Sequence, residues 1–391
     1  MSFFDGLQFF MVMLAGMVPA VIMGLCGKNL RYYSLGFSLV MIFLIYRENP
    51  REFLYLVLFV FLEWHVIALY QWLRRKYGHN KVIFHHFVLV ALLPLALSKI
   101  TGLMGGTLFS FLGISYVTFR VVQIIIESYD GLIEKSGFLD TVSFLVFFPT
   151  LSSGPIDRSK RFESDLYLTR TRKEYLEVMA AGLWKLMLGV AYKFVLSAIA
   201  FDVLERLSVS YSPLYLVGYA YVYGVYMFFD FAGYSLMAVG ASYVLGICTP
   251  DNFRKPFLSI DMKDFWDRWH ITLSHWFRDF IFSRYMMAAI RAKRFSSRLN
   301  AAASGFIVNM LIMGVWHGLT KDYILYGLYH GVLLALTEIY QKKSGFYKRN
   351  KGKRWYKLLS WFVTLNLVMF GFLIFSGRFF EALSALGNMV L

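Results

Sequence analysis

The sequence predicts an all-α integral membrane protein that crosses the bilayer many times. Its 391 residues are 58% hydrophobic, and the mean hydropathy is +0.55, which is high for a soluble domain. Long apolar runs recur along the chain, and a run of about 20 apolar residues can cross a bilayer as a helix. These runs are continuous and do not alternate with polar residues, so they exclude a transmembrane β-barrel.

The apolar segments indicate about eleven spans within one multi-pass domain that covers residues 1–391. The first segment has no basic region before it and no cleavage pattern after it, so we expect a retained helix and not a signal peptide. The run 213–247 is longer than one crossing and predicts either a strongly tilted helix or two elements. The segments lie near 7–26, 33–48, 53–73, 84–99, 107–126, 137–151, 177–203, 213–247, 303–317, 321–340 and 358–390.

The positions of the basic loops predict a membrane topology, and one loop does not fit it. The chain has 40 Lys and Arg against 24 Asp and Glu, and the basic residues gather in short loops, as in membrane proteins, so we expect membrane lipids and not nucleic acid as partners. Loops 28–31, 74–81 and 342–357 are predicted to be cytoplasmic, which places the N-terminus outside. When the crossings are counted from there, the basic loop 152–176 falls on the side of the membrane opposite to the cytoplasm, where a basic loop is not expected. We therefore expect a re-entrant or broken element between 84 and 151. Glycines that could break a helix there are Gly102, Gly105, Gly106 and Gly113.

The stretch DFWDRWHITLSHWFRDF, residues 264–280, is unusually charged and aromatic for such a chain. Its spacing predicts one amphipathic helix, too polar to span, that lies at the interface or dips into the protein. The polar stripe holds Arg268, Thr272, His275 and Asp279. The apolar stripe holds Phe265, Trp266, Trp269, His270, Leu273, Trp276, Phe277 and Phe280.

Two histidines of this segment have different expected surroundings. His275 falls on the polar stripe, where a solvated or ion-paired histidine is expected. His270 falls among the tryptophans, where it is either a hydrogen-bonded core residue or a catalytic group. On one helix the two rings would lie roughly 140° apart, which argues against a shared metal. The two cysteines are too few for a Cys-based zinc site, so we expect no metal centre.

A second candidate histidine lies within an apolar run. His317 ends the sequence MGVWH, and an ionisable residue at membrane depth is by default a candidate functional residue. Gly314 and Gly318 flank it and permit close approach by a helix or by a substrate. His330 lies thirteen residues further along, on roughly the opposite face.

Asp230 is the most conspicuous acidic residue inside an apolar run. It is either a structural hydrogen-bond centre, with Tyr223, Tyr226 or Tyr234 as partner, or part of a functional polar network. For that network we select Asp230, Asn309 and Tyr234 as candidates.

Together these segments resemble the membrane-bound O-acyltransferase (MBOAT) family. The motif DFWDRWHITLSHWFRDFIF is followed by an apolar segment ending MGVWHG, which places His270 and His317 in the family's order. The upstream segment FFDFAGYSLMAVG is also similar. LGISYVTFRVVQIIIESYDGLIE and FFPTLSSGPIDRSKRF resemble the branch of the family that acts in the Dlt system of Gram-positive bacteria, which adds D-alanine to teichoic acid.

The resemblance implies a fold and an activity. The fold would be a ring of membrane helices around a central funnel or tunnel, with re-entrant and amphipathic loop helices, in the plasma membrane of a bacterium. The activity would move D-alanine from the phosphopantetheine thioester of a small acidic carrier protein toward hydroxyls of lipoteichoic or wall teichoic acid. Partners would be that carrier and further Dlt membrane proteins, and no bound cofactor is expected.

The residues fit a mechanism of this kind. Acyl transfer from a thioester to a hydroxyl requires a general base, and we assign that role to His317. Backbone amides from Gly314 to Gly318, or His270, would stabilise the oxyanion. No serine or cysteine stands in a nucleophile motif. Basic residues that would attract an acidic carrier, or that only set the orientation in the membrane, are Lys263, Arg268, Arg291, Lys293 and Arg294.

Two alternatives remain open from the sequence. One is O-acetyl transfer to an extracellular polysaccharide, by the same type of chemistry. The other is a proton-coupled transporter or channel, in which intramembrane histidine, aspartate and lysine form the pathway. A transporter does not explain the charged aromatic segment, and the chain shows no internal repeat.

Overall fold

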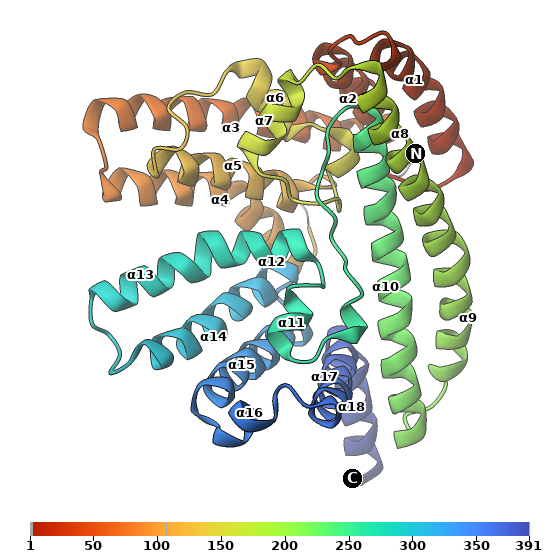
Figure 1. Cartoon of the computed structure of the whole chain (residues 1–391), viewed down its shortest axis with the longest axis vertical. Coiled ribbons are helices and arrows are strands. Elements are labelled where there is room, and N and C mark those ends of the chain that lie inside the picture. The colour runs from red at the N-terminus through yellow and green to blue at the C-terminus, as the bar shows by residue number, and fades with distance from the viewer. Residues whose placement is uncertain (1–2, 107, 391) are drawn as a thin grey trace. The chain divides into compact units, whose positions relative to one another are not determined.

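The described protein is helical throughout, as the sequence predicts. The structure is a computed structural model that describes residues 3–106 and 108–390, and within those residues it contains helices and no β-strand (Figure 1). In the same part of the chain, seven helices are long and apolar enough to cross a membrane. The prediction of an all-α multi-pass membrane protein is therefore confirmed. The total of about eleven spans and their arrangement in a ring stay predictions.

The chain forms two compact units. Unit 1 comprises the residues up to Val190 together with Tyr234–Asp251, and unit 2 comprises Ala191–Gly233 together with Asn252–Leu391. The long apolar run near 213–247 forms one continuous helix, α10 (Pro213–Val244), which contributes residues to both units.

Unit 1 contains the N-terminal helices. Helices α3, α4 and α5 pack against one another (Figure 1). Its elements besides part of α10 are α1 (Leu7–Leu25), α2 (Arg31–Tyr46), α3 (Pro50–Tyr77), α4 (Lys81–Leu103), α5 (Ile114–Tyr129), α6 (Phe138–Leu145), the 3-10 turn η1 (Phe148–Thr150), α7 (Ser159–Tyr167) and most of α8 (Arg172–Ala191).

The expected break between residues 84 and 151 is present. Helix α4 ends at Leu103, and the described residues up to Gly113 are not helical. Gly113 has φ +96°, and a Cβ there would lie 2.6 Å from the carbonyl oxygen of Leu151, so only glycine fits. Helix α5 has 16 residues and α6 has eight, both shorter than the run of about 20 that a crossing requires.

Helix α5 is buried inside unit 1 around an arginine. Its side chains from Tyr116 to Ser128 are all buried. The Arg120 guanidinium donates hydrogen bonds to the carbonyl oxygens of Phe144 and Leu145, at 2.6 and 3.1 Å, and to the carbonyl and hydroxyl oxygens of Thr150. Buried polar groups need such partners, so Arg120 fixes the otherwise irregular chain from α6 to η1.

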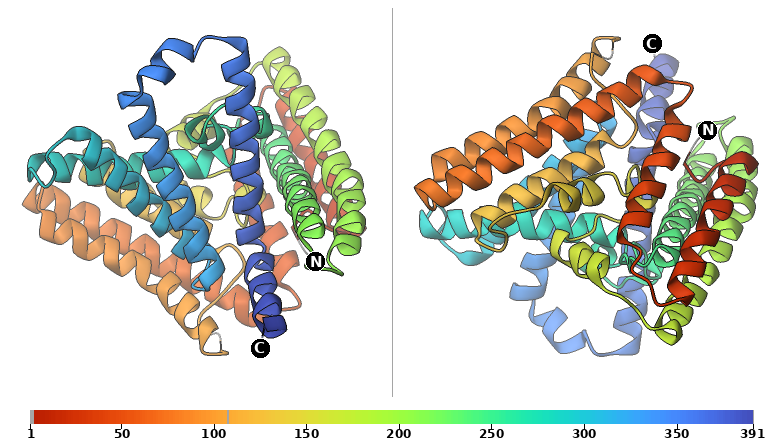
Figure 2. Two further views of the ribbon diagram at one scale, coloured as in Figure 1. Left: turned by 90° about the horizontal axis from the view of Figure 1, so that it is seen from below. Right: turned by 90° about the horizontal axis from the view of Figure 1, so that it is seen from above.

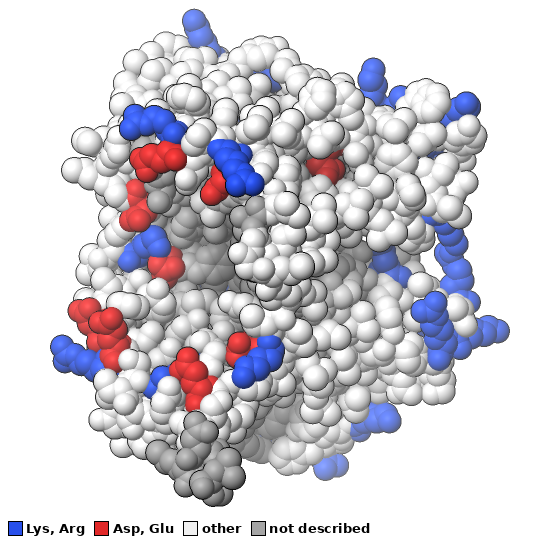
Figure 3. All heavy atoms as spheres, turned by 180° about the vertical axis from the view of Figure 1, so that it is seen from behind, with Lys and Arg blue, Asp and Glu red and all other residues white. Residues whose placement is uncertain are grey.

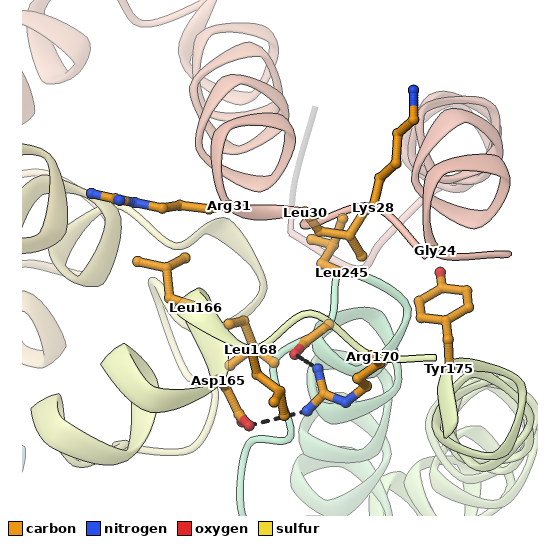
Figure 4. Close-up of a pocket in the computed structure, with 12 residues that line it drawn as sticks. Gly24, Lys28, Leu30, Arg31, Asp165, Leu166, Leu168, Arg170, Tyr175 and Leu245 are labelled. Carbon is orange, nitrogen blue, oxygen red and sulfur yellow. Dashed lines mark hydrogen bonds and ion pairs between the residues drawn. The ribbon is translucent and has the colours of Figure 1, made fainter. Parts of the chain in front are cut away.

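The basic loop 152–176 folds onto the end of α10. Arg170 donates to the carbonyl oxygen of Gly246 at 2.6 Å and pairs with Asp165 at 3.1 Å (Figure 4). Asp165 also pairs with Arg161 and accepts from the backbone amide of Cys248. The charges of this loop are thus used in part to hold it within unit 1.

Unit 2 contains the C-terminal helices and the charged aromatic segment. Figure 2 shows α14 and α15 side by side and α16 joining the ends of α15 and α17. The elements besides part of α10 are the π-helical turn η2 (Tyr192–Leu196), α9 (Ser197–Leu207), η3 (Pro256–Leu258), α11 (Met262–Trp266), α12 (Ile271–Phe277), the π-helical turn η4 (Arg278–Phe282), α13 (Ser283–Arg291), α14 (Arg298–His317), α15 (Lys321–Lys343), α16 (Gly345–Asn350), α17 (Arg354–Phe375) and α18 (Arg378–Val390).

The surface of the protein exposes many large apolar side chains, as expected where a protein contacts lipid. Large apolar side chains are exposed along the spanning helices, for example Phe61 on α3, Leu89 on α4 and Phe362 on α17. On the face drawn in Figure 3, charged side chains are sparse and uncharged residues cover most of the surface. Exposed apolar surface of this extent marks a membrane contact, so the chain is a multi-pass membrane protein.

Candidate active site

The charged aromatic segment is not a single helix. Helix α11 ends at Trp266, α12 begins at Ile271, and His270 between them has φ +44° and ψ +52°, the left-handed conformation. The prediction of one helix over 264–280 is therefore wrong. The angle of 140° between His270 and His275, which assumed that helix, does not apply either.

Hydrogen bonds that Asn252 accepts explain the break. The Asn252 carbonyl oxygen accepts from the backbone amide of Ile271 at 2.9 Å. Its side-chain oxygen accepts from the hydroxyl of Thr272 at 2.6 Å and from the Thr272 amide at 3.2 Å. The first amides of α12 are thus satisfied by a residue that lies well before them in the chain, and not by the preceding helix. Non-glycine residues adopt the left-handed conformation only where the surroundings impose it.

His270 itself is buried in an aromatic environment. Its side chain is 3% exposed, and its ring packs edge-on against Phe231 with centroids 4.7 Å apart. Within the described residues the Nε2 atom has no hydrogen-bond partner. Burial, and after it the electrostatic interaction with His317, lowers the pKa of His270 to about 3. His270 is therefore neutral at physiological pH and presents one donor and one acceptor nitrogen.

His317 is the last residue of α14, as the spacing of the apolar run suggested. Its position depends on close packing of α14 against α15. A Cβ on Gly314 would lie 2.4 Å from the carbonyl oxygen of Tyr323, and one on Gly318 would lie 2.3 Å from the Tyr323 ring. The expectation that these glycines permit close approach is confirmed, and what approaches them is α15.

Aromatic rings connect the two histidines within unit 2. The His317 ring lies 5.2 Å from the Phe375 ring and 6.4 Å from that of Tyr326. Tyr326 contacts the buried His330 at 4.5 Å, and His330 contacts Trp266 at 5.3 Å. The α11 end of the charged aromatic segment and the end of α14 are therefore joined by continuous packing. The electrostatic effect of His317 on His270 is consistent with this proximity.

A pocket of about 220 Å³ opens beside these elements. Asn309, Met313 and His317 are spaced by four residues and so share one face of α14; the first two line the pocket and His317 continues the same face one turn further along. Asn309 is buried, and its Oδ1 atom has no hydrogen-bond partner among the described residues. The lining residues are Lys263, Trp266, Asp267, Ser274, His275, Arg278, Phe282, Phe306, Asn309, Met310, Met313 and Leu334.

The three residues selected for a polar network have separate partners. Asp230 pairs with Lys193 at 2.5 Å. The hydroxyl of Tyr234 shares a hydrogen bond of 2.5 Å with Ser152 inside unit 1. Asn309 lies in the pocket just described. For Asp230 the structure thus shows an ion pair with a lysine, where the sequence suggested tyrosine partners.

The basic residues selected for carrier docking fall into two groups. Lys263 pairs with Glu338 and with Gln341, and Arg268 pairs with Asp264 at 2.6 Å, so both are held by neighbours. Arg291, Lys293 and Arg294 are exposed at the end of α13.

Two buried polar residues near the site, Asn252 and His330, were not among the site residues predicted from the sequence. Asn252 sets the backbone of His270, and no local pattern marks it, because its partners are distant in the chain. His330 is 1% exposed and its Nδ1 atom has no partner among the described residues. Its neighbours in YGLYHG are aromatic and small, which is the signal that could have indicated its burial.

Comparison with known proteins identifies the family. Residues 42–376 match the model of the MBOAT, membrane-bound O-acyltransferase family. A teichoic acid D-alanyltransferase of Bacillus subtilis is 38% identical over 97% of this chain and 99% of its own length. One of Streptococcus thermophilus is 40% identical over 82% of each chain.

A more distant relative is the probable alginate O-acetylase AlgI of Pseudomonas aeruginosa, 31% identical over 71% of this chain and 52% of its own length. The resemblance drawn from the two histidine motifs is thus confirmed, and an acyltransferase takes precedence over a transporter. This chain belongs to the membrane-bound O-acyltransferase family and is a membrane-bound acyltransferase.

Proposed function

We propose that this enzyme transfers D-alanine from the phosphopantetheine thioester of an acidic carrier protein toward hydroxyls of lipoteichoic or wall teichoic acid. The names of two relatives that match most of the chain, both teichoic acid D-alanyltransferases, support the acyl group and the acceptor. We further propose that the chain lies in the bacterial plasma membrane with its N-terminus outside and works with other Dlt membrane proteins. The basic loops near 74–81 and 342–357 support that orientation.

The observation that carries the proposal is the pairing of two histidines in unit 2. His317 ends a helix that glycine contacts fix in place, and the buried, neutral His270 belongs to the same unit, with its pKa lowered by burial and then by His317. In the proposed reaction His317 removes the proton of the acceptor hydroxyl as its oxygen attacks the thioester carbonyl. The C–O bond forms, the C–S bond breaks, and the proton passes from His317 to the departing sulfur. His270, as a neutral donor, stabilises the oxyanion.

The pocket beside α14 is the proposed path of the acyl donor. The buried Oδ1 of Asn309 suits an amide N–H donor, and a pantetheine arm carries two amides. Trp266 and Met313 contribute apolar surface to its lining. Acidic carrier docking is assigned to the exposed residues Arg291, Lys293 and Arg294, since charge complementarity guides encounters of this kind.

The first test is ester-linked D-alanine on the cell wall of cells that make only His317→Ala. We expect its loss with the variant present in the membrane at normal level. His85→Ala is the matched control, because His85 is exposed on α4, where its ring bonds to the carbonyl oxygen of Lys81 and packs against its neighbour Phe84. Normal D-alanine in the His317 variant would contradict the assignment of the general base.

The docking assignment has its own test. Charge reversal at Arg291, Lys293 and Arg294 should weaken binding of the purified carrier protein, and should do so less at high salt. Reversal of Arg75, Lys76 and Lys81, in another loop predicted to be cytoplasmic, is the control. Equal carrier binding by wild type and the first variant would refute docking at the end of α13.

A second candidate function is O-acetyl transfer to an extracellular polysaccharide, which the alginate O-acetylase relatives favour. The two functions differ in the donor that they require. Membranes containing the enzyme should label teichoic acid from a D-alanyl carrier protein and not from an acetyl donor. Acetyl-dependent labelling of a polysaccharide would establish the second function in its place.

A further inference from the structure

A second pocket of unit 2, of about 330 Å³, lies where α15, α16 and α17 meet the start of α11. Helix α16 connects the C-terminal end of α15 to the N-terminal end of α17 (Figure 2). None of the residues proposed for catalysis or carrier docking lines it. The lining residues are Ile260, Asp261, Met262, Thr337, Tyr340, Gln341, Phe346, Tyr347, Lys351, Tyr356, Lys357, Leu359, Ser360, Val363, Thr364 and Leu367.

One end of this pocket carries positive charge. Lys351 and Lys357 belong to its lining and are exposed. They stand within the basic sequence KKSGFYKRNKGKRWYK. The one carboxylate of the lining, Asp261, is engaged in the protein: it caps α11 by accepting from two backbone amides, and it accepts from the Gln341 amide at 2.9 Å. The two lysines are thus available to an anion.

The other end of the pocket is apolar and extends along a membrane span. Leu359, Val363 and Leu367 are spaced by four residues on α17, so they form one row about 12 Å long at 1.5 Å per residue. Half of a bilayer core is about 15 Å thick, so the row covers most of one leaflet. Helix α17 is among the helices able to span, and its neighbouring side chains Leu358 and Phe362 are exposed.

Hydroxyl groups also line this pocket. Tyr356, Ser360 and Thr364 form a second row on α17 beside the apolar one, and Thr337 and Tyr340 face the same pocket from α15. Along α17, Lys357 thus stands in the first turn, and the hydroxyl row and the apolar row run side by side from there. A phospholipid likewise has its phosphate at one end and an acyl chain extending away from it.

We propose that this pocket binds an anionic phospholipid of the adjacent leaflet. Its phosphate lies by Lys351 and Lys357, and one acyl chain lies along Leu359, Val363 and Leu367. A free phosphate would leave the apolar row uncovered, and a soluble acidic protein would not reach a row that descends into the bilayer. Because Met262 opens α11, the bound lipid also supports the segment that leads to His270.

The test is native mass spectrometry of the purified full chain with added phosphatidylglycerol, with phosphatidylcholine as the uncharged comparison and glycerol phosphate as the headgroup alone. We expect retained phosphatidylglycerol, little phosphatidylcholine and no glycerol phosphate. Lys351→Ala with Lys357→Ala should weaken phosphatidylglycerol binding roughly 25-fold, since each cation near an anionic membrane surface contributes about fivefold. Lys342→Ala with Lys348→Ala removes the same charge outside the pocket and should change binding little.

A second pair of variants tests the acyl chain. Val363→Trp fills the apolar row and should abolish binding with every lysine intact, whereas Leu358→Trp, exposed on the same helix outside the pocket, should not. Melting temperatures in detergent verify that each variant is folded. Equal loss in the two lysine pairs, or unchanged binding in Val363→Trp, would overturn the proposal. Saturation by glycerol phosphate would replace the lipid with a soluble phosphate ligand.

Discussion

The contact between α14 and α15 gives the sharpest prediction, because one methyl group tests it. In Gly314→Ala the new Cβ would lie 2.4 Å from the carbonyl oxygen of Tyr323 and 3.1 Å from the Cα of Gly327. Both neighbours are backbone atoms, so no rotamer change relieves the overlap. A normal carbon contact needs about 3.5 Å, so the two helices must separate by about 1 Å.

The free energy of this change has two opposing parts. Alanine in place of glycine in a helix interior stabilises by about 0.5–1 kcal/mol, whereas overpacking costs about 1–3 kcal/mol. We expect a net loss of about 1–2 kcal/mol. Gly36→Ala in α2 is the matched control, because among the described residues no atom beyond its own stretch of helix backbone lies within 4 Å of its Cβ position. There only the stabilisation by alanine applies, so the variant should be at least as stable as wild type.

The same shift should impair activity. His317, the general base of the proposed reaction, lies one turn beyond Gly314, and a displacement of about 1 Å at such a group would cost on the order of 100-fold in rate. The assays are the unfolding midpoint of the purified protein in mixed detergent and acyl transfer by the same samples. Gly314→Ala with wild-type stability and full transfer would refute the claim that this contact positions His317.

Three further predictions concern buried polar groups. Asn252→Ala removes the side-chain oxygen that accepts from the Thr272 amide and hydroxyl, so we expect a loss of about 2 kcal/mol in the free energy of unfolding and a fall in acyl transfer; wild-type activity would exclude a positioning role. The pKa of His270 is lowered to about 3 in the folded protein, whereas in the unfolded chain it is about 6.5. As the pH falls below about 6.5, His270 is therefore protonated in the unfolded chain before it is protonated in the folded protein. The free energy of unfolding should fall progressively from there toward pH 3, by about 2 kcal/mol at pH 5. His270→Asn, which tolerates the left-handed backbone, should show a smaller loss of stability between pH 7 and 5, and an equal loss would contradict this. Arg120→Ala leaves several buried carbonyls unsatisfied and should cost about 3 kcal/mol or more, seen as reduced protein in the membrane; Arg75→Ala, with one exposed hydrogen bond, should not.

Much of the fold could be predicted from hydropathy. An apolar run that must satisfy its own backbone groups in lipid has to be helical, so the helical class and most helix positions follow from the order of the residues. The glycines after α4 indicated a break because their backbone freedom is a local property. The residue types of the two histidine motifs likewise indicated the family before any geometry was known.

The interior of unit 2 depended on contacts that periodicity does not encode. The spacing of residues 264–280 predicted one helix, and hydrogen bonds that Ile271 and Thr272 donate to Asn252 interrupt it at His270. Asp230 found its partner in Lys193 on another helix, where its own helix offered tyrosines.

The sequence by itself therefore determined that this chain is a helical membrane acyltransferase with two candidate histidines, since hydropathy and motifs are read along the chain. Only the tertiary structure decided how those histidines are held: His270 by a turn whose following backbone amides donate to Asn252, and His317 by glycines that bring α14 onto α15. The physical reason is that buried hydrogen bonds and close backbone contacts join residues distant in the chain, and no local spacing specifies their partners.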